Sequence, residues 1–259
     1  MHLGVEVGAV GAARDHSLRV SVSGGDELGN LARTVNEMLT SLERLNTELE
    51  GERAKAERLL RNVLPGPIAE RLKHGEGTIA DAFDSVTVLF ADIVGFTTLS
   101  SKVPATELVV VLNDVFSRFD TLAERHGLEK IKTIGDAYMV VAGVPEPRPD
   151  HAVAVATMAL DMLDEIRAFN TELGIRIGIH SGPAVAGVIG KKKFIYDIWG
   201  DTVNTASRME STGMPGRVQV SDVTAQALDG ALAIEDRGVI AVKGKGEMRT
   251  WLLASRDAA

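Results

Sequence analysis

The sequence contains no cysteine, which excludes disulfide bonds, thiolate metal sites and cysteine nucleophiles and is compatible with a reducing compartment. It also lacks a basic excess: 28 Lys and Arg stand against 36 Asp and Glu, a net charge of −8. This balance argues against non-specific binding to nucleic acid or anionic lipid. No apolar run approaches the roughly twenty residues that span a bilayer, and the N-terminus has no signal-peptide pattern. We expect the chain as given to be soluble and cytoplasmic.

The composition itself is that of a globular protein, with 45% hydrophobic and 25% charged residues over 259 positions. This length suits one medium domain with an appendage. In the appendage, apolar residues from Leu28 to Val63 recur at alternating spacings of three and four, and only Glu52 breaks the series. Five such heptads predict a coiled coil; the alternative is a long helix packed on its own domain. Asn62–Pro67 ends the helix, because proline removes a backbone donor.

The segment Asp26–Met38 resembles the second helix of a HAMP linker, a module that joins membrane helices to cytoplasmic output domains. The resemblance implies a membrane anchor upstream of residue 1, so the chain is expected to be the cytosolic part of a membrane-anchored protein. We therefore predict three parts: residues 1–40 as a partial HAMP-like linker, 41–66 as a coiled-coil signalling helix and 67–259 as the catalytic domain.

Two acidic residues follow short apolar segments in the larger part of the chain. Val86–Ile93 is a predicted strand that contains Asp92 near its end, before a turn at Gly95, and Asp136 lies beside another apolar segment about forty residues later. Two carboxylates on neighbouring strands suggest a hard cation that holds a phosphate. The alternative is that each carboxylate only caps a turn.

Strand and helix patterns alternate along the rest of the chain. Helices are predicted at Ala105–His126, about 150–173 and Thr202–Glu210, with Gly75–Ala82 as a loop. A hairpin is predicted through Ser181–Pro183 by turn composition. Further strands are predicted at Glu129–Ile134, Ala137–Ala142, Ile175–His180, Val185–Ile189, Val218–Val220, Val239–Val242 and Met248–Leu252. The order β-α-β-β-α-β predicts an α+β, ferredoxin-like fold with its helices on one face of the sheet.

Five segments together resemble the class III nucleotidyl cyclase catalytic domain. They lie in order between Ser85 and Leu253, about two thirds of the chain, and their combination is far more specific than any one alone. The segments are Phe90–Thr97, Glu129–Tyr138, Arg176–Gly182, Tyr196–Met209 and Val242–Gly246.

The resemblance implies that Asp92, Asp136 and the backbone carbonyl of Ile93 hold two divalent cations, Mg²⁺ or Mn²⁺. The implied reaction joins a ribose 3′-hydroxyl to the α-phosphate of a nucleotide and expels pyrophosphate. It also implies that Lys132 and Asp197 read the purine. Because adenine needs one donor and one acceptor, whereas related guanylate cyclases carry Glu at the first position and Cys or similar at the second, this pair indicates ATP. Lys132 could instead be an ordinary exposed strand lysine.

Three further residues match family positions that act on ribose and phosphate. Asn204 matches the residue that orients the ribose, Arg208 the one that stabilises the pentavalent phosphate, and Lys243 the one that holds the terminal phosphates. A spacing of four puts Asn204 and Arg208 on one helix face. The alternative for Arg208 is a surface ion pair with Glu210 or Asp201.

In the resembled family each active site is divided between two catalytic domains, and this chain contains both sets of residues. We expect a homodimer through the coiled coil and the catalytic domains, because a parallel two-stranded coil shares the twofold axis of such a dimer. The predicted function is an ATP-cyclising adenylate cyclase. The alternatives are a guanylate cyclase of the same fold and a catalytically silent nucleotide-binding dimerisation module.

Three other features are given structural interpretations. Lys191–Lys193 is expected to be the solvated tip of a hairpin, and Lys130 a solvated strand residue. His180 is expected to be a core histidine, since no acid or oxyanion loop accompanies it.

Overall fold

The computed structural model describes residue 19 and residues 27–96, 103–169, 173–190 and 193–254. The chain divides into two compact units, residues 1–62 and 63–259, which are taken one at a time below. Most of the predicted HAMP-like segment, residues 1–18 and 20–26, lies outside the described residues. No helix among the described residues is long and apolar enough to cross a membrane.

The first unit contains one long helix, α2 (Glu27–Arg61). Its apolar stripe is exposed in the single chain: the fractions range from 42% for Leu42 to 60% for Leu59. The other large exposed members of the stripe are Leu31, Met38, Leu45 and Leu49. An exposed apolar stripe on an otherwise polar helix is unfavourable in water, so it favours packing against a second helix. The coiled coil itself stays a prediction.

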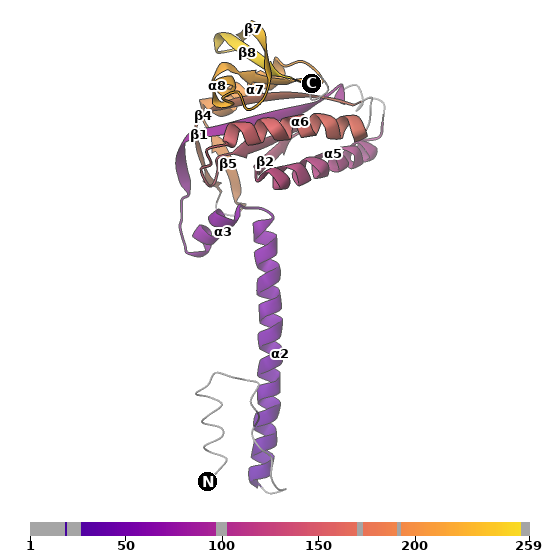
Figure 1. The fold of residues 1–259 in the computed structure, drawn as a ribbon. Helices are drawn as coiled ribbons and strands as arrows, with labels where there is room; N and C mark the ends of the chain where they lie inside the picture. The colour runs from indigo at the N-terminus through magenta and orange to yellow at the C-terminus, as the bar shows by residue number, and fades with distance from the viewer. Residues whose placement is uncertain (1–18, 20–26, 97–102, 170–172, 191–192, 255–259) are drawn as a thin grey trace. The chain divides into compact units, whose positions relative to one another are not determined.

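The second unit is built on one mixed sheet (Figure 1). Its strands run in the order β2-β3-β1-β4-β6-β8-β7, and β5 pairs with β4. The strands are β1 (Ala80–Val94), β2 (Glu129–Ile134), β3 (Ala137–Ala142), β4 (Gly174–Ile189), β5 (Ile195–Trp199), β6 (Val218–Ser221), β7 (Ile234–Val242) and β8 (Gly246–Leu253). The helices are α3 (Gly66–Lys73), α5 (Ala105–His126), α6 (His151–Phe169), α7 (Asp201–Ser211) and α8 (Asp222–Ala227).

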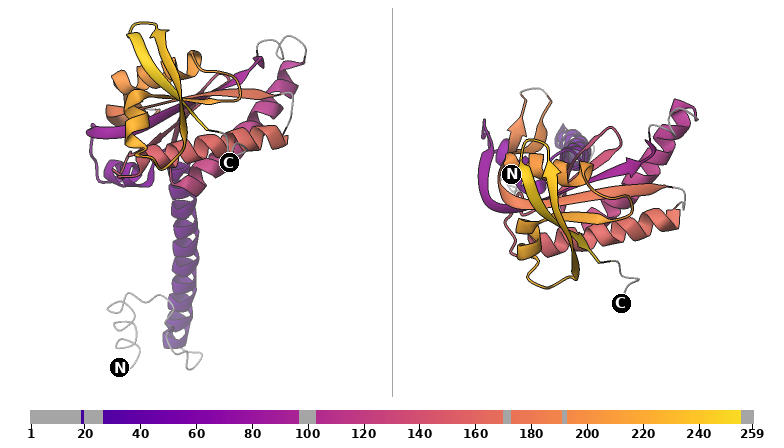
Figure 2. Two further views of the ribbon diagram at one scale, coloured as in Figure 1. Left: turned by 45° about the horizontal axis from the view of Figure 1, so that its top comes forward. Right: turned by 90° about the horizontal axis from the view of Figure 1, so that it is seen from above.

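The central four strands have the order expected of a ferredoxin-like sheet. β1 pairs antiparallel with both β3 and β4, and β2 pairs with β3. Beyond β4 the sheet continues through parallel β6 to the β8–β7 hairpin, which is yellow in Figure 2. The predicted α+β, ferredoxin-like fold is confirmed, and the sheet is larger than the minimal motif.

Helices α5 and α6 cover one face of the sheet, as predicted. Leu89 on β1 and Ile177 and Ile179 on β4 join Phe119 and Met158 from these helices in one buried cluster. The prediction is wrong for α7, which lies on the opposite face. A β-carbon at Gly178, between the two isoleucines, would come within 1.8 Å of the backbone nitrogen of Glu210 in α7. Glycine therefore allows the helix to press directly on the strand.

The hairpin predicted through Ser181–Pro183 is also wrong, since β4 is continuous across these residues. Ser181 is buried and bonded to Thr87, and the pairing of β1 with β4 shifts register between Phe83 and Val86, opposite Pro183. A bulge is where a strand accepts proline. The actual hairpin joins β4 to β5, with Lys193 exposed between them; Lys191 and Lys192 are outside the described residues. The predicted loop also ends earlier, because β1 begins at Ala80.

Candidate active site

The sheet brings the two predicted metal carboxylates together. Asp92, near the end of β1, pairs in register with Ala137 of β3, the residue directly after Asp136. Gly135, with φ of 64°, makes the turn between β2 and β3 that presents Asp136 at this edge. Burial and the neighbouring charge of Asp136 raise the pKa of Asp92. Two carboxylates this close repel each other unless a cation lies between them. Ile93, whose carbonyl is the third predicted ligand, is buried beside them, 3% exposed.

An arginine that the sequence analysis left without a role contacts this pair. Arg176, opposite Asp92 on β4, donates from Nη2 to Asp92 Oδ2 at 3.1 Å and from Nε to Glu210 Oε1 at 2.7 Å. Glu210 is buried at the end of α7, and burial raises its pKa. In the sequence, the one signal that could have indicated Glu210 is its position directly after the Tyr196–Met209 segment, which contains Arg208. These contacts connect the carboxylate edge of the sheet to α7.

The predicted purine pair is also assembled. Lys132 on β2 donates from Nζ to Asp197 Oδ2 on β5 at 2.5 Å. The backbone nitrogen of Ile198 donates to the other Asp197 oxygen at 2.9 Å, which fixes the carboxylate plane. A lysine and an aspartate from distant parts of the sequence therefore lie side by side, and the role of Lys132 in reading the purine stays a prediction.

Asn204 and Arg208 lie on α7, one turn apart. The ion pairs considered for Arg208 do not form: Glu210 bonds Arg176, and Asp201 bonds Lys245. Among the residues that the structure describes, no side chain pairs with the Arg208 guanidinium, which is half-buried. A half-buried guanidinium without a side-chain partner is available to bind an anionic ligand.

Lys243 lies at the turn between β7 and β8, and its side chain is exposed. Its neighbour Lys245 is instead held by Asp201 at the start of α7, an ion pair that lowers the pKa of Asp201. This contact ties the turn to α7, so Lys243 is presented from a fixed backbone.

The charged residues that act on the pKa of Asp92 are Asp136 and Arg176. That the two carboxylates and the substrate-reading residues serve different sites of a dimer stays a prediction.

The donor set at the carboxylate edge fits a divalent cation. Oxygen ligands from two aspartates and one carbonyl are what Mg²⁺ and Mn²⁺ prefer, and Mg²⁺ commonly takes only one or two carboxylates, completing its shell with substrate phosphates. The juxtaposed charges of Asp92 and Asp136 give the cation an electrostatic reason to bind here.

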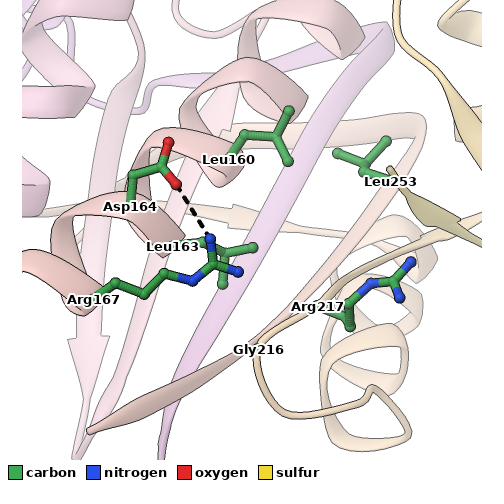
Figure 3. Close-up of a pocket in the computed structure, with 7 residues that line it drawn as sticks. All are labelled: Leu160, Leu163, Asp164, Arg167, Gly216, Arg217 and Leu253. Atoms are coloured by element: carbon green, nitrogen blue, oxygen red, sulfur yellow. Dashed lines mark ion pairs between the residues drawn. The ribbon is translucent and has the colours of Figure 1, made fainter. Parts of the chain in front are cut away.

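The small pocket in Figure 3 is unrelated to these residues. It encloses about 10 Å³, room for about one water, between α6 and the loop before β6. It is lined by Leu160, Leu163, Asp164, Arg167, Gly216, Arg217 and Leu253, and by none of the predicted site residues.

Two of the structural interpretations can be judged directly. His180 is half-buried, not fully in the core as predicted: it bonds Ser221 Oγ at 2.6 Å, and burial lowers its pKa to about 4. Lys130 is not merely solvated, because it pairs with Asp120 at 2.7 Å and lies 5.4 Å from the ring centre of Tyr138.

The domain is an extended ferredoxin-like sheet with two carboxylates near the ends of interior strands and cationic side chains on α7 and the β7–β8 turn, an arrangement suited to a metal-bound phosphate. Comparison with known proteins identifies the family. Residues 79–255 match the adenylate and guanylate cyclase catalytic domain, and residues 6–44 match the HAMP domain. The chain belongs to the adenylate and guanylate cyclase catalytic domain family.

The relatives include proteins named for either purine. An adenylate cyclase of Mycobacterium tuberculosis is 48% identical over 236 residues, covering 89% of this chain and 53% of its own length. The chain thus spans about half of that curated relative. The solved guanylate cyclase domain of RhGC from Catenaria anguillulae, in complex with GTP, is 42% identical with a TM-score of 0.66, covering 68% of this chain and 99% of the other. A rhodopsin-guanylyl cyclase core with converted specificity, in complex with ATPalphaS, is 44% identical with a TM-score of 0.65, covering 68% and 98%. Overall similarity therefore does not choose the purine.

Proposed function

We propose that the protein is an adenylate cyclase that converts ATP to 3′,5′-cyclic AMP and pyrophosphate at sites shared between two copies of the chain. The observation that carries the choice of ATP is the contact between Lys132 and Asp197. Adenine presents a ring nitrogen that accepts and an amino group that donates. The lysine has further N–H donors and the aspartate further lone pairs beyond their mutual bond, so the pair offers a donor and an acceptor side by side.

Guanine fits this pair poorly. Guanine presents the O6 acceptor where adenine has its amino donor, and an N1–H donor where adenine has its ring acceptor, so both contacts of the Lys132–Asp197 pair are reversed. A substrate that leaves buried polar groups unpaired is rejected strongly. The guanylate cyclase alternative is thus disfavoured by the same two side chains.

Asp92, Asp136 and the carbonyl of Ile93 are proposed to hold two divalent cations, Mg²⁺ or Mn²⁺. When bound, these cations supply a lowered pKa for the ribose 3′-hydroxyl and neutralise the triphosphate charge. The 3′-oxygen forms a bond to the α-phosphorus while the bond to pyrophosphate breaks, and the hydroxyl proton leaves to solvent. Atoms and charge balance with no further reactant.

The remaining predicted site residues orient the substrate and stabilise the charge on its phosphates. Asn204 holds the ribose, so that its 3′-oxygen lies in line with the breaking bond. Arg208, one helical turn away and without a protein partner in the described part of the chain, contacts the α-phosphate as charge develops on it. Lys243 neutralises the terminal phosphates from the β7–β8 turn.

A homodimer with shared sites is supported by two observations. The chain contains both sets of residues that the family divides between two domains, and the apolar stripe of α2 is exposed. A twofold pairing places the carboxylates of one copy against Lys132, Asp197, Asn204, Arg208 and Lys243 of the other. The proposed arrangement is residues 1–40 as a HAMP-like linker, 41–66 as a coiled-coil helix that transmits an upstream signal, and 67–259 as the catalytic part. The chain is then the cytosolic part of a membrane-anchored protein.

The catalytically silent alternative is disfavoured because both carboxylates and Arg208 are present. The test is an assay of purified protein with ATP and with GTP, in Mg²⁺ and in Mn²⁺, across protein concentration. The proposal expects cyclic AMP as the main product and specific activity that rises with concentration. Cyclic GMP as the main product would refute the purine argument, and no product at any concentration would favour the silent module.

A further inference from the structure

The end of α7 is held by a buried amide that the proposed chemistry does not use. Gln219 lies on β6, and none of its surface is exposed. Val218 and Val220, on either side of it, face the core cluster that includes α5 and α6, so Gln219 points to the opposite face of the sheet, toward α7. Its register partner on β4 is Gly178, which has no side chain.

The Gln219 amide begins a chain of hydrogen bonds that ends on the backbone of Arg208. Its Nε2 donates to the Met209 carbonyl at 3.0 Å and to Thr212 Oγ1 at 2.9 Å. The Thr212 hydroxyl in turn donates to the Arg208 carbonyl at 2.7 Å. Because a hydroxyl has one proton and this one is used on Arg208, the Thr212 oxygen accepts from Gln219, and the orientation of the amide is fixed.

The other half of the amide shows that this chain has a cost. The Gln219 oxygen, Oε1, is enclosed and has no partner within the described residues. A buried acceptor without a partner is unfavourable, and an apolar side chain of similar length, such as methionine, would avoid that loss. Packing alone therefore does not account for glutamine at this position, whereas its two donated hydrogen bonds do.

A second donor reaches the same end of α7 from β7. Arg237 lies at the bulge between Asp236 and Gly238, and its Nη1 donates to the Thr212 carbonyl at 2.7 Å. A cation at the C-terminal end of a helix interacts favourably with the helix dipole. This contact lies beyond the last residue of the helix, so the link to Arg208 itself runs through the Thr212 hydroxyl and Gln219.

Arg208 depends on its backbone for its direction. Its guanidinium pairs with no side chain in the described part of the chain, so the helix alone determines where it points. Arg208 lies in the last turn of α7, which ends at Ser211. The final turn of a helix frays readily, because its carbonyls have no partner within the helix. The chain from Gln219 supplies partners to two of these carbonyls.

We propose that Gln219 and Thr212 are positioning residues for Arg208. They hold the last turn of α7 on β6, so that the guanidinium meets the α-phosphate as charge develops on it. This inference rests on the proposed function, and it adds two residues that act through Arg208 without touching the substrate. Their contacts are separate from that of Arg176, which bonds the Glu210 side chain rather than the backbone.

The test separates kcat from substrate binding. Arg208 is proposed to act in the transition state, so displacing it should lower kcat and leave ground-state binding unchanged. For Gln219→Met we expect kcat to fall by about tenfold to 100-fold, the scale of a misplacement of about 1 Å. Calorimetry with saturating Mn²⁺ measures the Kd of 3′-deoxy-ATP, which cannot cyclise, and this Kd should stay within about twofold of wild type.

Thr212 offers a matched pair of variants. Thr212→Ser keeps the hydroxyl and should retain kcat within about threefold of wild type, whereas Thr212→Val breaks the chain and should lose as much as Gln219→Met. The control is Gln226→Met on the exposed side of α8, because it removes an amide that also donates to a protein oxygen, Asp222 Oδ2, and should leave kcat unchanged. Thermal melting checks that each variant is folded.

Three results would overturn the inference: wild-type kcat in folded Gln219→Met, equal losses in Thr212→Ser and Thr212→Val, or a rise in Kd that matches the fall in kcat. A wild-type chain that makes no cyclic nucleotide refutes the proposed function and, with it, the basis of this inference. An active wild type with an unaffected Gln219→Met refutes the positioning role alone.

Discussion

At the scale of single residues, the purine choice depends on two side chains that sequence order keeps 65 positions apart. Lys132 and Asp197 could be predicted because each lies in a motif that resembles a known family. Their contact could not be deduced from local patterns, since it requires β5, a strand that the sequence analysis did not predict. In the structure, β5 pairs with β4, and Asp197 on β5 lies within hydrogen-bond distance of Lys132.

Exchanging this pair should exchange the substrate. Lys132→Glu combined with Asp197→Cys replaces the donor with an acceptor, so we expect the ratio of kcat/KM for ATP over GTP to fall by at least about 100-fold, the scale of one misplaced buried hydrogen-bond set. Rates with both nucleotides measure this ratio. The control is Lys130→Gln, which should leave it unchanged; an unchanged ratio in the double variant would contradict the assignment.

Glu129 also makes a prediction for stability. Burial raises its folded pKa to about 7, above the usual value of 4.5, so between these values the folded protein binds more protons than the unfolded chain. Stability from this group therefore falls as pH rises from about 4.5 to 7 and stays low above that. Glu129→Gln should be about 1–2 kcal/mol more stable than wild type at pH 8, and the gain should vanish near pH 4. Urea unfolding at the two pH values checks this; an equal gain at both would contradict it.

At the scale of elements, sequence patterns predicted α5, β2 and β3 with the bounds that the structure has. α5 is amphipathic and β2 alternates polar and apolar residues, whereas β3 is a short apolar run that follows the turn at Gly135. The patterns failed where tertiary contacts override local composition. Ser181–Pro183 has turn composition yet lies in β4, because the buried Ser181 hydroxyl is hydrogen-bonded and a bulge in the β1–β4 pairing accommodates the proline. Helix α8 was missed because six residues are too few to show a helical period.

The close packing of α7 on β4 could not be predicted from hydrophobic periodicity, because it depends on the absence of a side chain at Gly178. Gly178→Ala would place a β-carbon 1.8 Å from the Glu210 nitrogen and 2.3 Å from the Met209 carbonyl carbon. The helix must shift, so we expect a loss of about 1–3 kcal/mol and a large fall in kcat, because Arg208 and the Glu210–Arg176 contact move with it. Gly77→Ala, where nothing lies within 4 Å, is the control. Wild-type stability and rate in Gly178→Ala would show that α7 does not need this contact.

At the scale of the whole molecule, the chain contains both sets of predicted site residues, and we expect dimerisation to combine sets from two copies. Sequence alone could predict this division only through the family resemblance, because local patterns do not show which strands and helices are neighbours. Asp92 lies near the end of the interior strand β1, and Arg176 connects it to Glu210 of α7, the helix of Asn204 and Arg208.

The most direct test of the shared site mixes two inactive variants. Asp92→Ala and Arg208→Ala homodimers should each lose nearly all cyclase activity, whereas a heterodimer has one site with every residue intact. Random reassociation of equal amounts makes half of the dimers heterodimers with one of two sites intact, so the account predicts recovery to about a quarter of the wild-type rate of cyclic AMP formation. No recovery, with heterodimers demonstrated by differential tagging, would contradict it.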